Sequence, residues 1–364
     1  MRRRYSTYKG CLLGLAAGDA MGYPVDSSNL EQIREDFGPQ GLMGYDMRND
    51  HADVTSYTQI AAFSANGILL GLTRGKLYGK RAPLVKYIGL ALREWGRSQH
   101  YTDPVPDFCW LSRQPALKRR RCMDTWMLNV LERKELGTPV APTSQSNHPA
   151  ALTAVIPLTL VQAGHGISQE ELDLMGAETV AMTHGNPDAF LAGAMLTHLL
   201  SRVLEEPALS WEELVPDTCD AIQIQFGRYY PQTGGLLELM HMALLMAKEP
   251  VSSMDAMERL SCRTASEVLA GAVYACATCG EDFDTAMIAA VNHSGRSSAV
   301  GAIAGALLGA KLGMEAVPEF YLESLEPVSL LQELACDLVQ GRDMEIGSSL
   351  FDDDWDRKYL HGGQ

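Results

Sequence analysis

The sequence predicts an all-α protein, folded as a single orthogonal bundle of helices. Apolar residues recur at helical spacing along most of the 364 residues, whereas the alternation typical of strands is nearly absent. Proline and glycine fall between the apolar stretches, where short turns would join one helix to the next. Helices are therefore expected around residues 11–17, 60–72, 87–95, 125–131, 152–161, 191–203, 236–246, 265–277 and 300–312.

These helices are expected to form one domain over residues 1–364. Turn signals such as Gly38-Pro39, Pro142 and Pro318 separate successive helices, but no low-complexity linker and no repeat of fixed period divides the chain. We expect a core over about residues 5–313 and a C-terminal helical or tail extension over about residues 314–364.

Composition and net charge limit the kinds of molecule that we expect this protein to bind. With 46% apolar and 21% charged residues, the chain can bury a large core. A formal charge of −15 argues against nucleic acid or anionic lipid and leaves small molecules or proteins as partners. No apolar stretch reaches the roughly 20 residues that span a bilayer. The eight cysteines form no compact framework, so a reducing, cytoplasmic location is expected.

Two glycine-rich segments lie near opposite ends of the predicted core. Residues 10–22 carry glycines four apart, a spacing that lets helix backbones approach closely, and residues 299–310 form a Gly/Ala-rich helix. Asp19 follows the first of these glycine runs. Of its two interpretations, a buried capping residue is favoured over a catalytic carboxylate.

These segments and a third one resemble the ADP-ribosylglycohydrolase family in order and spacing. Residues 10–26 are similar to its opening Gly-x-x-x-Gly-x-x-x-Gly-Asp-x-x-Gly-x-x-x-Glu, with Asp26 at the acidic position. Residues 54–60 are similar to Ser/Thr-Asp-Asp-Thr-Gln-Met, and residues 291–310 to an Asn-rich turn followed by Gly-Asp-Ser/Thr-Asp-Ser/Thr. The resemblance implies the all-α fold of that family and a site where aspartates bind two Mg²⁺ ions.

The aspartates themselves are replaced. Ser56, Tyr57, Arg296 and Ser298 occupy the four positions that the resemblance assigns to metal-binding aspartates. Hard divalent cations require oxygen ligands and prefer carboxylate charge. We therefore expect no Mg²⁺ and no other cofactor, a metal-free pocket, and no hydrolysis of ADP-ribose by the route of the family.

Arg296 places a positive charge where the family pattern has a negatively charged aspartate. Its guanidinium stays protonated and would repel a divalent cation, but its planar fork suits phosphate or carboxylate. Two interpretations remain open: Arg296 contacts an anionic ligand, or it pairs with Asp26 or Asp19 as a structural plug.

The segment that the resemblance assigns to ADP-ribose binding has also changed. Residues 146–157 replace a Ser-Lys-Gly-Cys-Gly-Gly loop and contain no glycine, and residues 119–125 replace an Arg-x-Pro-Gly-Asn-Thr turn. The segment Thr183-His-Gly-Asn-Pro187 is retained, and the resemblance implies that His184 contacts ribose or phosphate. As a residue alone, His184 fits a hydrogen bond at a helix terminus equally well. The basic run at residues 118–121 is expected on a solvated helix face.

Three functions follow as hypotheses. The favoured one is an inactive relative that binds an ADP-ribose-like, nucleotide or other anionic small molecule. The second is a protein-interaction module that docks on an ADP-ribosyltransferase or an active homologue. The third is a metal-independent glycohydrolase with Asp26 as a weak candidate for the general acid or base. The expected ligand-binding residues are Ser56, Tyr57, Ser146, His184, Asn292, Arg296 and Ser298.

Overall fold

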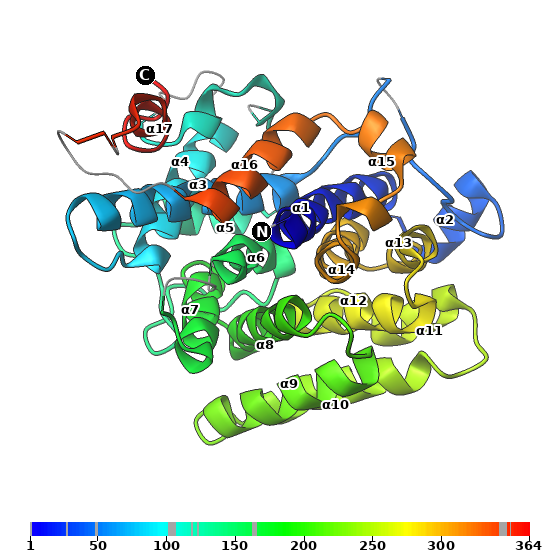
Figure 1. Ribbon diagram of the computed structural model, residues 1–364. Helices are drawn as coiled ribbons and strands as arrows, with labels where there is room; N and C mark the ends of the chain where they lie inside the picture. Colours follow the sequence, from blue (N-terminus) through cyan, green and yellow to red (C-terminus); the bar gives the residue numbers. More distant parts are fainter. Residues whose placement is uncertain are drawn as a thin grey trace.

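The computed structural model describes residues 2–26, 28–47, 50–100, 107–117, 119–121, 124–161, 166–341, 348–349 and 351–364, and helices dominate this part of the chain (Figure 1). The α-helices are α1 (Arg2–Gly22), α2 (Leu30–Phe37), α3 (Ser56–Leu77), α4 (Leu84–His100), α5 (Thr125–Leu131), α6 (Val155–Leu160), α7 (Gln169–Ala181), α8 (Pro187–Glu205), α9 (Trp211–Phe226), α10 (Thr233–Met246), α11 (Ser253–Leu260), α12 (Ala265–Cys279), α13 (Phe283–Val291), α14 (Ser297–Leu312), α15 (Glu319–Glu323), α16 (Val328–Gln340) and α17 (Asp353–Tyr359). Short 3₁₀ helices are η1 (Tyr23–Val25), η2 (Trp110–Arg113), η3 (Pro115–Leu117), η4 (Pro149–Ala154) and η5 (Met314–Ala316).

The predicted all-α class is confirmed. Each of the nine apolar stretches lies in helix, except that residues 152–160 divide between η4 and α6 and Val161 is the C-cap of α6. Among the described residues, the only β-type pairing is an isolated bridge between Ala52 and Leu325. Several helices were not predicted, among them α7 and α9, although each begins at a serine N-cap, Ser168 and Ser210.

The glycine-rich helices α1 and α14 pack directly against each other. They run antiparallel, since a Cβ atom built on Gly10 would lie 2.3 Å from the carbonyl oxygen of Gly309, and one built on Gly18 would lie 1.9 Å from that of Gly301. Such distances leave no room for a side chain. The predicted close approach of helix backbones is therefore confirmed. This pairing brings the C-terminus of α1 to the N-terminus of α14.

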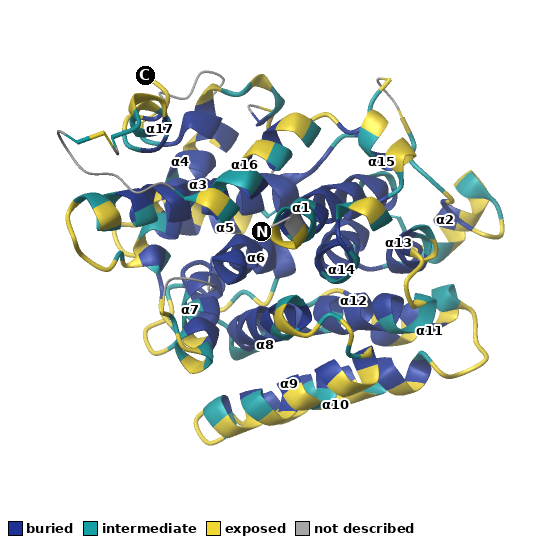
Figure 2. Cartoon of the chain, viewed as in Figure 1, coloured by how far each residue is buried: buried dark blue, intermediate teal, exposed yellow. Residues whose placement is uncertain are grey.

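The remaining helices surround this pair. Figure 2 shows α1, α8, α12 and α14 almost entirely buried, whereas α9 and α10 form an outer layer with one exposed face. The C-terminal segment packs on the core, because α16 contacts α1 and Trp355 of α17 donates a hydrogen bond from Nε1 to Thr73 Oγ1 of α3 (2.9 Å). No helix of the described part has the length and apolar character needed to cross a bilayer.

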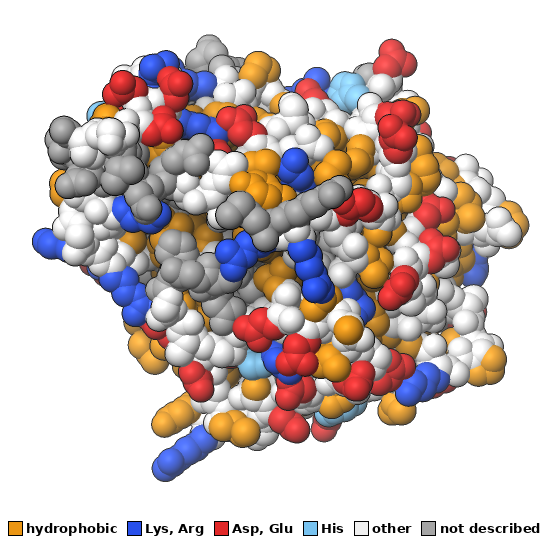
Figure 3. All heavy atoms as spheres, in the orientation of Figure 1, with side chains coloured by type: hydrophobic (Ala, Val, Ile, Leu, Met, Phe, Trp, Pro, Cys, Tyr) orange, Lys and Arg blue, Asp and Glu red, His pale blue; other side chains and the backbone are white. Residues whose placement is uncertain are grey.

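Charged side chains are mixed over the visible surface. In Figure 3 the Asp and Glu side chains gather at several places, with Lys and Arg side chains between them. This face shows no continuous basic stripe, which agrees with the excess of 45 acidic over 30 basic residues in the sequence.

Candidate functional site

The candidate site begins at the N-terminus of α3, which Asp19 fixes to α1. Asp19 is fully buried, and its carboxylate accepts hydrogen bonds from the backbone N–H groups of Thr55 (2.8 Å) and Thr58 (3.1 Å) and from both threonine hydroxyls (2.6 Å each). Burial raises the pKa of Asp19 to about 6 despite these four hydrogen bonds, which favour the charged form. Asp19 is buried as predicted, but it lies within α1 and is not a helix N-cap: Thr55 is the N-cap of α3, and Asp19 binds the start of that helix from α1.

Asp26 connects the end of α1 to the N-terminus of α14. Its Oδ1 accepts a hydrogen bond from the backbone N–H of Ser298 (2.8 Å), which satisfies one of the free amides at the start of that helix. Its Oδ2 is buried and has no hydrogen-bond partner. Burial raises the pKa of Asp26 to about 6, against the opposing effects of the Ser298 amide and the Arg296 charge.

Tyr57, the second residue of α3, lies between these groups. Its side chain is fully buried, and its hydroxyl has no hydrogen-bond partner. Burial, reinforced by the negative charge of Asp26, raises the pKa of Tyr57 well above its ordinary value, so the hydroxyl stays protonated. Ser298 Oγ is likewise buried without a partner. Two hydroxyl groups and one carboxylate oxygen therefore remain unsatisfied at the junction of α1, α3 and α14.

Arg296 is the N-cap residue of α14 and is partly buried. Its backbone N–H donates to the carbonyl oxygen of Cys262 (2.7 Å), whereas its guanidinium makes no hydrogen bond or ion pair with any described residue. The charge of Arg296 nevertheless acts on the pKa values of Asp26, Tyr57 and His148. The ion pair with Asp26 or Asp19 that the structural-plug interpretation requires is not present.

Next to this junction lies a group that sequence reasoning did not find: Asp124, His148 and His184. Asp124 is the N-cap of α5, where its Oδ1 accepts from the backbone N–H of Trp126 (3.0 Å). Its Oδ2 lies 3.0 Å from His184 Nε2 and 3.9 Å from His148 Nδ1. One potential ligand atom from each of the three residues lies within 4.8 Å of the others.

The pKa values in this group reflect both burial and mutual contact. Burial would raise the pKa of Asp124, but the hydrogen bond and charge of His184 outweigh it and hold this pKa below the ordinary value. Burial lowers the pKa of His148 to about 4, assisted by the charges of Arg296 and His184 and opposed by Asp124. His148 is therefore a neutral imidazole at neutral pH.

Of the other predicted ligand residues, Ser56 begins α3 as a buried residue, and Ser146 and Asn292 are engaged with the backbone. Ser146 Oγ accepts from the backbone N–H of His148 (3.2 Å) and so orients that residue. Asn292 is buried and exchanges two hydrogen bonds with the backbone of Leu42, at 2.7 and 2.9 Å. Its side chain therefore holds the segment around Leu42 to the end of α13.

The basic run does not lie on a helix, which corrects the prediction for its described residues, 119–121; Lys118 lies outside the described residues. Arg121 donates to Asp53 Oδ1 (2.6 Å), and Arg119 donates to the same oxygen (3.0 Å). Arg121 is mostly buried in this pairing, at 13% side-chain exposure. Arg119 and Arg121 are therefore paired with Asp53, which lies just before α3, and do not form a solvated helix face.

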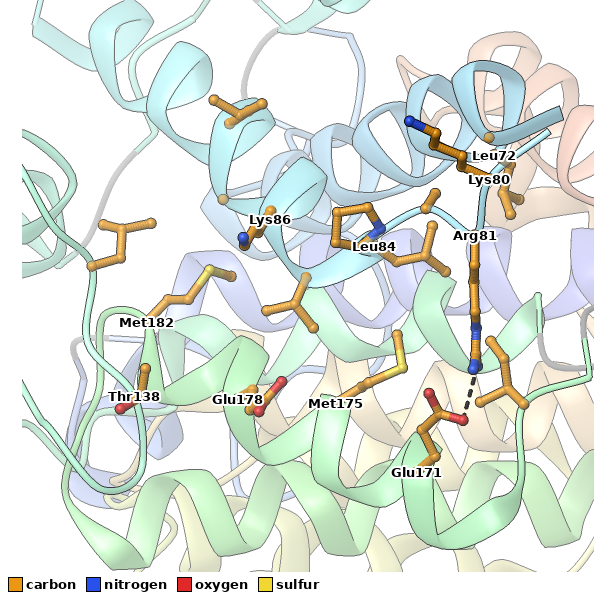
Figure 4. A pocket seen from close by; sticks show the side chains of 18 of the residues that line it. Leu72, Lys80, Arg81, Leu84, Lys86, Thr138, Glu171, Met175, Glu178 and Met182 are labelled. Atoms are coloured by element: carbon orange, nitrogen blue, oxygen red, sulfur yellow. Dashed lines mark ion pairs between the residues drawn. The ribbon is translucent and has the colours of Figure 1, made fainter. Parts of the chain in front are cut away.

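A large cavity lies away from these residues, between α3, α4 and α7 (Figure 4). It has a volume of about 1290 Å³ and a mostly apolar lining that includes Leu72, Leu84, Met175 and Met182. Figure 4 shows the ion pair between Arg81 and Glu171 (2.8 Å) at one side of this cavity. None of the predicted site residues lines it.

Comparison with known proteins agrees with this architecture. A model of the family described as ADP-ribosylglycohydrolase matches residues 1–346. A solved structure described as "ADP-ribosylglycohydrolase-related protein complex" is similar with a TM-score of 0.62 and 23% sequence identity, over 94% of this chain and 100% of that chain. No curated protein matches the sequence.

The protein is an all-α bundle, in which the pairing of α1 with α14 brings the N-termini of α3 and α14 together. At 23% identity the solved structure supports the fold alone. The family model covers most of the sequence, and the chain belongs to the ADP-ribosylglycohydrolase family.

Proposed function

We propose that this protein binds an anionic small molecule at Arg296 and does not hydrolyse ADP-ribosyl bonds with a pair of Mg²⁺ ions. The main observation is the Arg296 guanidinium, which makes no ion pair with any described residue although Asp26 is close enough for its pKa to respond. A partly buried guanidinium without a partner is costly unless a ligand supplies one. Phosphate and carboxylate both match its fork of N–H donors.

The remaining groups suit the polar part of such a ligand. Tyr57 and Ser298 offer buried hydroxyls without partners, and Asp26 Oδ2 offers an acceptor. The N-terminus of α14 adds a positive dipole end next to Arg296. A phosphate or carboxylate at Arg296, with ligand hydroxyls near Asp26, would satisfy all of these groups. An ADP-ribose-like or other nucleotide-like molecule has this chemistry.

The residues present do not fit two Mg²⁺ ions. Asp19 already accepts four hydrogen bonds, and Asp26 supplies only one free carboxylate oxygen. Mg²⁺ requires several oxygen ligands with net negative charge, and Arg296 adds a positive charge at this point. The proposal therefore includes no metal-dependent step at this junction.

Calorimetric titration tests this function with ADP-ribose, inorganic pyrophosphate and MgCl₂ as probes. We expect ADP-ribose or pyrophosphate to bind, and MgCl₂ to give no heat of binding. Arg296→Ala should abolish anion binding, and Arg296→Lys should weaken it because the bidentate fork is lost. Arg228→Ala is the matched control, since Arg228 is exposed and distant in sequence from the site.

Two results would contradict the proposal. Tight Mg²⁺ binding, or release of ADP-ribose from an ADP-ribosylated protein, would show that the family reaction persists. Absence of binding to both anionic probes would remove the small-molecule function and favour docking of a protein partner instead.

A further inference from the structure

We propose that Asp124, His148 and His184 form a binding site for one divalent transition-metal ion, such as Zn²⁺ or Fe²⁺. Two imidazoles and one carboxylate are a donor set that suits these ions, whereas Mg²⁺ prefers oxygen alone. Three protein ligands leave further coordination positions open to solvent or a small ligand. This inference does not depend on anion binding at Arg296.

The Asp124 carboxylate is oriented for this purpose by the start of α5. Its Oδ1 accepts from the Trp126 amide (3.0 Å), and this bond fixes the rotation of the carboxylate. Its Oδ2 is consequently directed at both imidazoles, 3.0 Å from His184 Nε2 and 3.9 Å from His148 Nδ1. Ligand atoms of one metal ion at bond lengths of about 2 Å lie roughly this far apart.

His184 has the supporting contact that metal-bound histidines usually have. The hydroxyl of Thr183 lies 2.8 Å from its Nδ1. A hydroxyl can donate or accept, so His184 can hold its proton on Nε2 towards Asp124, or on Nδ1 towards Thr183 with Nε2 free for a metal. Since His184 is fully buried, this contact also fixes the ring.

His148 presents an unprotonated nitrogen towards Asp124. Its Nδ1 accepts from the backbone N–H of Ala150 (3.2 Å) and is therefore unprotonated; a metal ion would take this lone pair in place of the Ala150 hydrogen bond.

A second potential metal group in the described part of the chain provides an internal control. His51, Asp53 and Glu326 also bring ligand atoms within 4.8 Å of one another. There, however, Asp53 already pairs with Arg119 (3.0 Å) and Arg121 (2.6 Å). Two guanidinium groups oppose a cation at this second group, and we expect it to bind none.

Titration of the EDTA-treated full-length protein with Co²⁺ tests the site, because the visible absorption of bound Co²⁺ reports its ligands. We expect one Co²⁺ per chain in the wild type. Asp124→Asn retains the helix cap but removes the charge, and it should weaken Co²⁺ binding by more than about 10-fold, as should His184→Gln. Thr183→Val should weaken it about 10- to 100-fold. His51→Gln should leave it unchanged.

The outcomes separate this inference from the proposed function. Arg296→Ala should still bind Co²⁺, because it removes a nearby positive charge and no ligand. Thermal unfolding in EDTA checks that Asp124→Asn is folded as the wild type is. Three results would overturn the metal site: absence of Co²⁺ binding to the wild type, unchanged binding in both Asp124→Asn and His184→Gln, or loss of binding in His51→Gln.

Discussion

The two buried carboxylates Asp19 and Asp26 share a pKa of about 6 but differ in their hydrogen bonds. Since 6 lies above the ordinary value of 3.8, the folded protein binds a proton that the unfolded protein releases over this range. The contribution of such a group to stability is therefore present at low pH and is lost as pH rises through 6. For a group raised from 3.8 to about 6, the loss is at most about 3 kcal/mol.

We expect Asp26→Asn to raise the free energy of unfolding at pH 7 by up to about 3 kcal/mol and to have little effect near pH 4. The reason is that Asn Oδ1 can still accept from Ser298 N–H, while a neutral amide group replaces the buried negative charge at the unpartnered Oδ2. Urea unfolding at the two pH values measures the difference.

Asp19→Asn is the comparison, and it should give no gain at pH 7. Its carboxylate accepts from two amides and two hydroxyls, and an amide side chain cannot accept all four. An equal increase in stability from both substitutions would mean that burial alone, and not the unpartnered oxygen, determines the effect.

Single residues were the hardest part of the site to predict from sequence. The burial of Asp19 was predicted, but its hydrogen bonds to Thr55 and Thr58 of α3 were not. The clustering of Asp26, Tyr57, Arg296 and Ser298 followed from the resemblance. Asp124 and His148 were missed because 24 and 36 residues separate them from each other and from His184, and only the tertiary fold joins them. Asp124 precedes an apolar helix, and its role as an N-cap explains it well enough that the sequence did not suggest a metal ligand.

Among the helices, the glycine contact between α1 and α14 gives the clearest prediction. A Cβ added to Gly305 would lie 2.0 Å from the carbonyl oxygen of Gly14, so one helix must move. We expect Gly305→Ala to lower the free energy of unfolding by about 1–3 kcal/mol or more. Chemical denaturation provides the measurement.

Gly235→Ala is the control for helix propensity. Gly235 lies in the first turn of α10, and a Cβ there meets no atom within 4 Å. This substitution should stabilise the protein by up to about 1 kcal/mol, because alanine favours helix. A stabilising Gly305→Ala would contradict the packing that we describe for α1 and α14.

Helix positions were largely predictable because apolar periodicity is a local signal. The apolar stretches placed the buried helices, such as α3, α8 and α12, correctly. The helices α7 and α9 were missed, although Ser168 caps α7, and Ser210 with Glu213 forms a capping box at α9. Caps of this kind are visible in the sequence and would have found both.

At the scale of the whole molecule, we expect that aspartates placed at the four positions that the resemblance assigns to metal ligands do not produce hydrolysis of ADP-ribosyl bonds. The variant Ser56→Asp, Tyr57→Asp, Arg296→Asp and Ser298→Asp rebuilds the acidic positions at both ends of the core. Residues 149–154, however, form the buried helix η4 where the resemblance implies a glycine-rich loop, and we expect that a helix here does not bring its amides close to a ligand.

Two measurements test this four-residue variant. Mg²⁺ should raise its thermal unfolding temperature, because it neutralises the added carboxylates, and it should not raise that of the wild type. Release of ADP-ribose from an ADP-ribosylated protein should stay at the background of the wild type. Substantial release would contradict this expectation, because the four aspartates would then suffice for hydrolysis.

The pairing of α1 with α14 also constrains how the chain folds. The contacts Gly10 to Gly309 and Gly18 to Gly301 join segments separated by almost the whole core, so α1 lacks its main packing partner, α14, until residue 312 is available. Loop closure of this length and high contact order slow folding. During synthesis, the apolar, glycine-lined face of α1 stays exposed while ten or more later helices emerge. We therefore expect that a chaperone or transient non-native packing must protect this face until α14 is made.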